Sequence, residues 1–275
     1  MSLSGRCVWV VGGAGFLGSC LARMCREIGA RPLVIDPACD ATCGVPLCAG
    51  EPGMPERALA LSPEPPSVVF ICAATRGGDA AAYRRTYLAP ALCLAASVPD
   101  ARLIFCSSTA VYQDLAVVSE NSPTVVDSEK MHVLLQAEEV VLRAGGVVAR
   151  LAALYGEGRC ELLRRHMCGE PQLPGAPERV LNYVHVQDAA QALIRMAAHP
   201  LGGRVYNVCA ESFTKAEAAE MLERVTGRGA SGAESPPGRR GLRNHRVSAE
   251  LLRRELGWAP AVHFVDFISD SLSAT

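Results

Sequence analysis

The sequence has no long hydrophobic run, no excess of charge of either sign and few aromatic residues. Its 275 residues include 27 Lys and Arg against 28 Asp and Glu. No apolar stretch approaches the roughly 20 residues of a membrane span, and the N-terminus lacks the cationic and apolar regions of a signal peptide. The balanced charge offers no basic surface to nucleic acid or to an anionic membrane. We therefore expect a cytoplasmic globular protein with neither nucleic acid nor membrane among its partners.

The sequence also lacks the cysteine spacing of a metal site. It has 12 cysteines, but most of them stand inside apolar runs, where cysteine serves as a small buried hydrophobe. Cys39, Cys43 and Cys48 form the only cluster. A zinc site needs paired short spacings and a fourth nearby ligand, which this cluster does not have. We predict no metal.

The strongest pattern that is present runs from Cys7 to Asp36. An apolar run at 7–11 predicts a buried parallel strand, and it is followed directly by Gly12-Gly13-Ala14-Gly15-Phe16-Leu17-Gly18. Apolar residues at helical spacing then lead to Gly29, and a second short strand ends at Asp36. This stretch is a βαβ unit of the length that a dinucleotide site requires.

The glycines and the acid give this unit its chemistry. Gly12, Gly15 and Gly18 let the backbone turn tightly and approach a pyrophosphate, whose charge is favoured at the helix N-terminus. Asp36, at the end of the second strand, is placed to accept hydrogen bonds from the adenosine ribose and would repel a 2′-phosphate. The pattern predicts NAD as the cofactor and favours it over NADP.

Alternating strand and helix patterns continue to the end of the chain, although prolines weaken them between residues 37 and 66. They predict an α/β fold with a doubly wound parallel sheet of the Rossmann type and a small C-terminal substrate lobe. We place residues 1–155 in the Rossmann domain, with 181–202 returning to it, and 156–180 and 203–275 in the lobe. Within these ranges we expect a helix capped by Asp188 and another, at 214–226, capped by Thr214 and Glu217.

The spacing Gly12-x-x-Gly15-x-x-Gly18 resembles that of the extended short-chain dehydrogenase/reductases, the NAD-dependent epimerase/dehydratase family. The resemblance implies cofactor contacts from Phe16 and Leu17 and from Ala73 and Ala74, which end a later strand. It also implies that Ser108, in Ser107-Ser108-Thr109-Ala110-Val111-Tyr112, polarises the substrate. The same alignment places Thr109 beside Ser108 and Tyr112 in the substrate pocket. Tyr183 is assigned to the pocket as well, because it can reach the cleft from a strand end.

The family's Tyr-x-x-x-Lys catalytic pair is missing, since no tyrosine stands between residues 113 and 154. If Glu138 matches the glutamate that usually follows the pair, Lys130 takes the tyrosine position and Leu134 the lysine position. If Lys130 is kept as the lysine, Val126 takes the tyrosine position. The first register is preferred because it gives the helix a consistent apolar face. The chain then resembles an atypical branch of the family that lacks the pair.

Two further departures concern the substrate. Tyr87 stands where most extended members have an asparagine, and Leu181 replaces the arginine that grips a nucleotide-sugar diphosphate. Lys130 is the candidate for a substitute general acid, with a solvated helix residue as the alternative.

Two functions remain open. The first is an oxidoreductase, or an isomerase or lyase that uses hydride transfer, acting on a small molecule through Ser108 and Lys130. The second is a dinucleotide-binding sensor or scaffold without catalysis. The oligomeric state is open, with a homodimer among the alternatives. Residues 227–246, rich in Gly, Ser, Pro and Arg, predict a mobile surface flap.

Overall fold

The central sheet of this computed structural model is built from parallel strands. The structure describes residues 2–39, 44–75, 77–170, 173, 175–229 and 244–273. In this part of the chain the sheet has six strands in the order β2-β1-β3-β4-β6-β9, and every neighbouring pair is parallel. The strands are β1 (Cys7–Val11), β2 (Arg31–Ile35), β3 (Val68–Ile71), β4 (Arg102–Ser108), β6 (Val147–Leu151) and β9 (Arg204–Val208).

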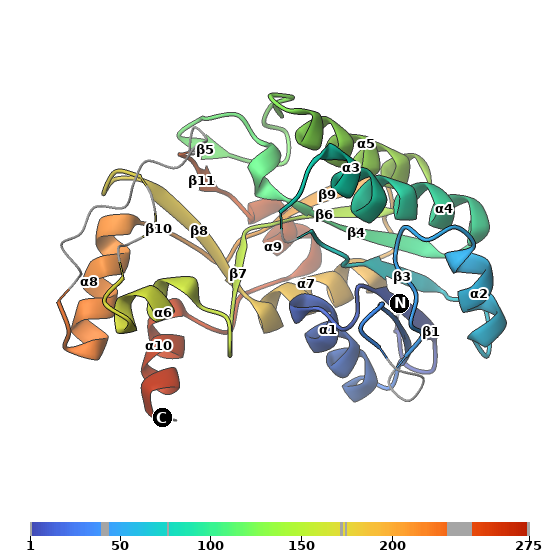
Figure 1. Cartoon of the computed structure of the whole chain (residues 1–275), viewed down its shortest axis with the longest axis horizontal. Coiled ribbons are helices and arrows are strands. Elements are labelled where there is room, and N and C mark those ends of the chain that lie inside the picture. Colours follow the sequence, from blue (N-terminus) through green and yellow to red (C-terminus); the bar gives the residue numbers. More distant parts are fainter. Residues whose placement is uncertain are drawn as a thin grey trace.

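Helices cover both faces of this sheet (Figure 1). On one face, α1 (Phe16–Glu27) packs against α7 (Val186–Ala198), and on the other, α4 (Ala89–Ser97) packs against α5 (Glu129–Arg143). All five residues of β1 and of β6 are buried, as expected for strands that are covered on both sides. The predicted doubly wound α/β fold is confirmed. The remaining elements of this domain are α2 (Met54–Leu61), α3 (Ala80–Tyr83), the π-helical turn η1 (Arg84–Leu88) and the 3₁₀ turn η2 (Thr109–Val111).

A second, smaller core lies beside the main sheet. The strands β7 (Ala153–Tyr155), β8 (Val180–His185) and β10 (Glu211–Thr214) form a sheet in the order β10-β8-β7. Around it stand α6 (Glu161–Met167), α8 (Lys215–Thr226) and α10 (Phe264–Ser273), on the left of Figure 1. Thr214 and Glu217 form the predicted capping box of α8.

The boundary of this lobe differs from the prediction. We expected all of 203–275 in the lobe, but β9 pairs with β6 in the main sheet. Two further elements lie after residue 244: β11 (Arg246–Val247), which pairs with β5 (Val117–Val118), and α9 (Glu250–Leu256). Leu252 of α9 and Trp258 belong to the main core. The chain therefore crosses between the cores more often than the sequence predicted.

Asp188 does not cap α7, contrary to the prediction. The cap is His185, whose Nδ1 accepts a hydrogen bond from the Gln187 N–H at 3.4 Å. The buried Asp188 carboxylate accepts hydrogen bonds from the N–H groups of Ala261 at 2.9 Å and Val262 at 3.1 Å. It therefore anchors the C-terminal segment to the main domain, a long-range role that a local sequence pattern does not reveal.

The cap formed by His185 predicts a pH dependence of stability. Burial lowers the pKa of His185, so the folded state keeps the ring neutral at a pH where the unfolded chain binds a proton. Stability from this residue is therefore lost as the pH falls through its unfolded pKa of about 6.5. Urea unfolding at about pH 7.5 and about pH 5.5 should show a smaller loss in His185→Asn than in wild type, because asparagine caps helices without titrating. An equal loss in both proteins would contradict this role.

Candidate functional site

The glycine-rich loop after β1 is held against the end of β3. Gly12 has a φ of +81°, and a Cβ on it would lie 2.4 Å from the backbone nitrogen of Ala73. A Cβ on Gly18 would lie 2.2 Å from the Gly12 carbonyl oxygen. Neither position tolerates a side chain. Gly15 is the N-cap of α1, and no side chain in the described ranges caps that helix. The positive end of α1 is therefore available to an anion.

Asp36 lies beside this loop at the end of β2. Its Oδ2 accepts a hydrogen bond from the Ala14 N–H at 3.2 Å, and its Oδ1 accepts one from the Ala38 N–H at 2.9 Å. Each carboxylate oxygen has a second lone pair, so both can still accept a hydrogen bond from a ligand hydroxyl. The backbone contacts fix the direction in which the acid faces.

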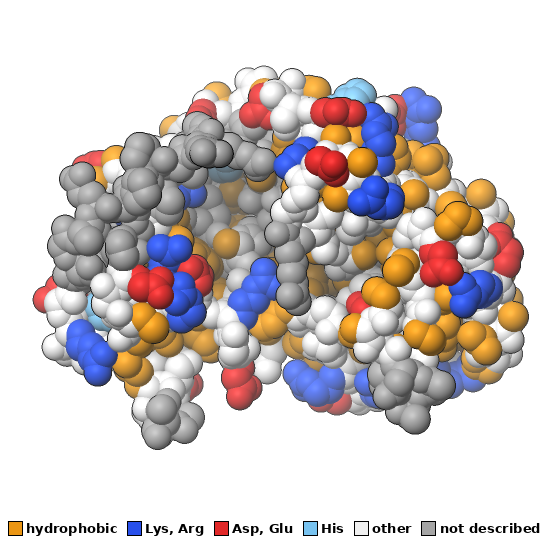
Figure 2. All heavy atoms as spheres, viewed as in Figure 1, with side chains coloured by type: hydrophobic (Ala, Val, Ile, Leu, Met, Phe, Trp, Pro, Cys, Tyr) orange, Lys and Arg blue, Asp and Glu red, His pale blue; other side chains and the backbone are white. Residues whose placement is uncertain are grey.

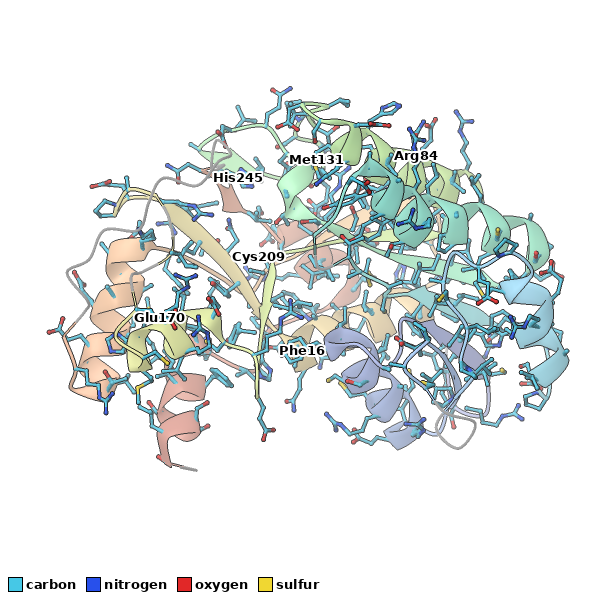
Figure 3. The ribbon with its side chains drawn as sticks, in the orientation of Figure 1. Phe16, Arg84, Met131, Glu170, Cys209 and His245 are labelled. Carbon is cyan, nitrogen blue, oxygen red and sulfur yellow. The ribbon has the colours of Figure 1, made fainter. Side chains whose placement is uncertain are left out.

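The loop opens into a cleft of about 1490 Å³. Figure 2 shows the molecule hollowed between the main domain and the lobe, and in Figure 3 Phe16 and Met131 stand on opposite sides of this space. Eight of the predicted site residues line it: Gly12, Gly15, Phe16, Leu17, Asp36, Ala73, Ala74 and Ser108. Gly18 lies beneath the loop instead, packed against the Gly12 backbone. The cleft thus brings the expected cofactor loop and the expected catalytic serine into one space.

The two serines at the end of β4 differ in their hydrogen bonds. Ser107 donates from Oγ to Oε1 of the buried Glu138 at 2.5 Å. The half-exposed Ser108 accepts at Oγ from the Ala110 N–H at 3.2 Å, which leaves its own proton available to the cleft. Of these two serines, Ser108 is therefore the one whose hydroxyl can donate to a ligand oxygen.

Three residues assigned to the substrate pocket lie elsewhere. Tyr112 is fully buried and donates its hydroxyl to Oδ1 of Asn207 at 2.6 Å; burial also raises the pKa of this phenol. Thr109 is buried in the turn η2. Tyr183 belongs to the second core, where its ring stacks on Phe213, and burial raises the pKa of Tyr183 as well. The assignment of these three residues to the pocket is corrected, because all three are buried and none of them lines the cleft.

Helix α5 presents aliphatic side chains to the cleft. Met131 and Leu134 line it, while Lys130 does not. The half-buried Lys130 places its Nζ 5.7 Å from the centre of the Tyr83 ring, at the cleft's edge. Leu134 facing the cleft agrees with the register that puts it in the lysine position, whereas Val126 is 59% exposed. The absence of a Tyr–Lys pair in the sequence therefore corresponds to an apolar wall in the structure.

The cleft also contains polar residues that were not among the predicted site residues. Tyr83, Tyr87, Arg85 and Arg159 line it. Tyr87 accepts a hydrogen bond at its hydroxyl from the Thr75 N–H at 3.1 Å and stands in the π-helical turn η1, a distortion often found at functional sites. The Tyr83-x-x-x-Tyr87 spacing was the available signal for the tyrosines. Arg159 follows a glycine turn, and no pattern in the sequence indicated that it would line the cleft.

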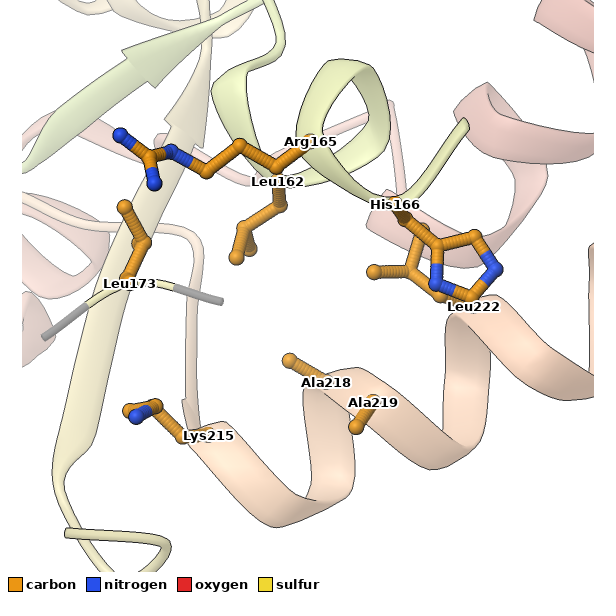
Figure 4. A pocket seen from close by; sticks show the side chains of 8 residues that line it. All are labelled: Leu162, Arg165, His166, Leu173, Lys215, Ala218, Ala219 and Leu222. Carbon is orange, nitrogen blue, oxygen red and sulfur yellow. The ribbon is translucent and has the colours of Figure 1, made fainter. Parts of the chain in front are cut away.

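A crevice between α6 and α8 offers no second site. Figure 4 shows its lining, which includes Leu162, His166 and Lys215. Its volume is about 10 Å³, which is at or below the minimum for one water molecule. We assign it to the packing of the lobe.

The predicted flap at 227–246 falls mainly outside the described residues, which resume at Asn244. The Asn244 side chain accepts a hydrogen bond at Oδ1 from the Val180 N–H, and His245 is buried. The end of the predicted flap is therefore fixed against β8. In the described ranges, no helix is long and apolar enough to cross a membrane.

Comparison with known proteins places these features in context. The model of the "NAD dependent epimerase/dehydratase family" matches residues 8–209. Protein YeeZ of Escherichia coli K12 is 35% identical over 113 residues, a match that spans only 40% of either chain. UDP-glucose 4-epimerase of Thermotoga maritima, solved with UDP-glucose, has a TM-score of 0.81 at 20% identity over 97% of both chains. dTDP-glucose 4,6-dehydratase of Bacillus anthracis, solved with NAD, has a TM-score of 0.81 at 18% identity, over 98% of this chain and 96% of that one.

Proposed function

The chain belongs to the NAD dependent epimerase/dehydratase family, and from this premise we propose that it binds NAD in the cleft and uses it to oxidise or reduce a small molecule. One observation carries the proposal. The uncapped N-terminus of α1, the tightly packed Gly12 and Asp36 all meet at the cleft that contains Ser108.

The residues present fit a dinucleotide. The first turn of α1 would hold the pyrophosphate, and Asp36 would accept from the adenosine ribose. Ala73 and Ala74, small residues at the end of β3, leave room beside the loop for the rest of the cofactor. When bound, the nicotinamide supplies the acceptor or donor of a hydride. Ser108 would orient a substrate oxygen by donating its hydroxyl proton.

The choice between NAD and NADP depends on Asp36. We expect wild type to bind NADH more tightly than NADPH, because a 2′-phosphate would meet a carboxylate. Asp36→Ala should weaken NADH binding by about 1–2 kcal/mol, the order expected for lost hydrogen bonds to a charged group. Calorimetric titration of both nucleotides measures this.

A matched variant isolates the charge. Asp36→Asn keeps a side chain of the same shape but removes the repulsion, so the preference for NADH over NADPH should narrow. Glu27→Gln, an exposed change on α1 outside the cleft, serves as the control and should leave both affinities unchanged. Equal or tighter NADPH binding by wild type would refute the assignment of Asp36.

The catalytic part of the proposal uses an unconventional acid or base. Met131 and Leu134 occupy the α5 wall, so α5 itself offers no acid or base inside the cleft. Lys130 at the edge of the cleft is the candidate, with water as the alternative. Nucleotide sugars are disfavoured as substrates because Leu181, in place of a diphosphate-binding arginine, is buried in the second core.

The apolar α5 wall favours a second candidate function, a non-catalytic NAD-binding sensor or scaffold. Both functions require the protein to bind the cofactor, so a measurement of NAD binding does not distinguish them. Oxidation or reduction of the bound nicotinamide in a screen of alcohols, aldehydes and ketones does, when followed by absorbance. Reduction of NAD by any of these compounds in a Ser108-dependent manner would exclude the sensor.

A further inference from the structure

Arg159 stands on a short, tightly fixed loop between the two cores. The loop leaves β7 at Tyr155, and Gly156 and Arg159 then close on each other through two backbone hydrogen bonds of 3.0 and 2.9 Å. Gly158 supplies the positive φ of +69° that this turn requires. The backbone at Arg159 is therefore held in place although its side chain is exposed.

The loop closes onto the first residue of α1. The Arg159 guanidinium carbon lies 5.1 Å from the centre of the Phe16 ring. A Cβ on Gly156 would lie 3.2 Å from Cζ of the same ring, so the loop approaches Phe16 closely. Phe16 directly follows the N-cap Gly15. The arginine thus reaches from the lobe to the helix end that the proposed function assigns to the pyrophosphate.

The charge of Arg159 is not neutralised within the described ranges, where no carboxylate forms an ion pair with it. Its neighbours in sequence differ, because Arg164 and Arg165 both pair with Glu161. An aromatic face orients a guanidinium without satisfying its N–H donors. Arg159 therefore presents free donors to the cleft, next to a helix end that also favours negative charge.

We propose that Arg159 binds a phosphate of the dinucleotide and so closes the lobe onto the cofactor. This inference rests on the proposed function, since it assigns a further contact to the same ligand. The Phe16 ring lies against the guanidinium, and a guanidinium can donate two parallel hydrogen bonds to phosphate oxygens. The cofactor is then bound from both sides, by the α1 N-terminus and by the lobe.

The test uses ADP-ribose, which has the pyrophosphate but no nicotinamide, and adenosine, which has neither. Arg159→Met should weaken ADP-ribose binding about tenfold in calorimetry, the loss of a charge-assisted hydrogen bond, and should leave adenosine binding unchanged. Arg159→Lys should recover part of the affinity, because it keeps the charge but not the planar fork. Added salt should narrow the difference between wild type and Arg159→Met, since exposed charges are screened.

Arg23→Met is the matched control, because it removes the same charge from the exposed side of α1 and should change neither affinity. If wild type binds ADP-ribose and Arg159→Met binds it equally well, the phosphate contact is refuted while the proposed function stands. If Arg159→Met loses adenosine binding to the same extent as ADP-ribose binding, the residue acts on the shape of the cleft and the inference is also overturned. Failure of wild type to bind ADP-ribose at all would overturn both.

Discussion

Glu138→Gln is expected to lower the free energy of unfolding by about 3 kcal/mol, the order found when one partner of a buried ion pair is removed. Glu138 on α5 is 2% exposed and Arg150 on β6 is 6% exposed. Arg150 donates from Nη2 to Oε2 of Glu138 at 2.6 Å and from Nε to Oε1 at 3.1 Å. Burial alone would lower the pKa of Arg150, but the hydrogen bonds and charge of Glu138 raise it. The variant leaves this guanidinium buried without its counter-charge.

A neighbouring pair on the same helix provides the control. Glu139 also pairs with an arginine, Arg143, but their side chains are 58% and 79% exposed. Glu139→Gln should therefore cost no more than about 0.5 kcal/mol. Urea unfolding of the two variants measures the contrast. A loss below about 1 kcal/mol in Glu138→Gln would contradict the expectation, since it would mean that the buried arginine finds another partner.

Glu138→Gln should also disturb the strand end that lines the cleft. Ser107, which lines the cleft, donates its hydroxyl to Glu138, and Tyr112 packs its ring 4.9 Å from the Arg150 guanidinium. The ion pair therefore supports the end of β4, the strand that carries Ser108.

We expect the Glu138→Leu, Arg150→Met double variant to recover part of the stability that Glu138→Gln loses, because two apolar groups replace two desolvated charges.

The glycine loop and Asp36, which form the proposed cofactor half of the candidate site, could be predicted because their signals are local. The continuous apolar run of β1, the three glycines and Asp36 lie within thirty residues of each other, from Cys7 to Asp36. Each element there adopts the structure that its own residues favour, and parallel pairing then brings the ends of β1, β2 and β3 to one edge of the sheet. The glycine pattern alone specified where backbone must approach backbone, and the contacts of Gly12 and Gly18 show that approach.

The substrate half was less predictable because its residues are placed by distant partners. Tyr112 follows Ser108 by four residues in the sequence, but its hydroxyl donates to Asn207 on β9 and is held in the core. Asp188 has the spacing of a helix cap, yet its partners stand more than 70 residues later. Arg159 reaches the cleft only because the lobe folds back onto Phe16. Nothing in the local periodicity of these segments encodes such contacts.

Ser108→Ala is expected to lower the rate of any hydride transfer by about 10²–10³-fold, the loss measured when one donor to a reacting oxygen is removed. Of the two serines at the end of β4, Ser108 has its hydroxyl proton available to the cleft, whereas Ser107 donates its hydroxyl proton to Glu138. The measurement is single-turnover reduction of bound NAD with a substrate found by screening. Thr109→Val is the control: it removes a neighbouring hydroxyl that is buried outside the cleft lining, and it should change the rate little. Comparable losses in both variants would show a general disturbance of the strand end.

UDP-glucose and related nucleotide sugars are expected to give no turnover at the rates typical of the family. General acid and base catalysis by a positioned side chain contributes about 10²–10⁴-fold, and the α5 wall offers only Met131 and Leu134 for that work. Leu181 adds nothing to hold a diphosphate. Slow turnover of another substrate should depend on Ser108, and its rate should fall in Lys130→Met, since the Lys130 ammonium lies 5.7 Å from the ring centre of the cleft-lining Tyr83. Rapid epimerase or dehydratase activity in a chain with this apolar wall would mean that the proton is carried by a residue other than those named here.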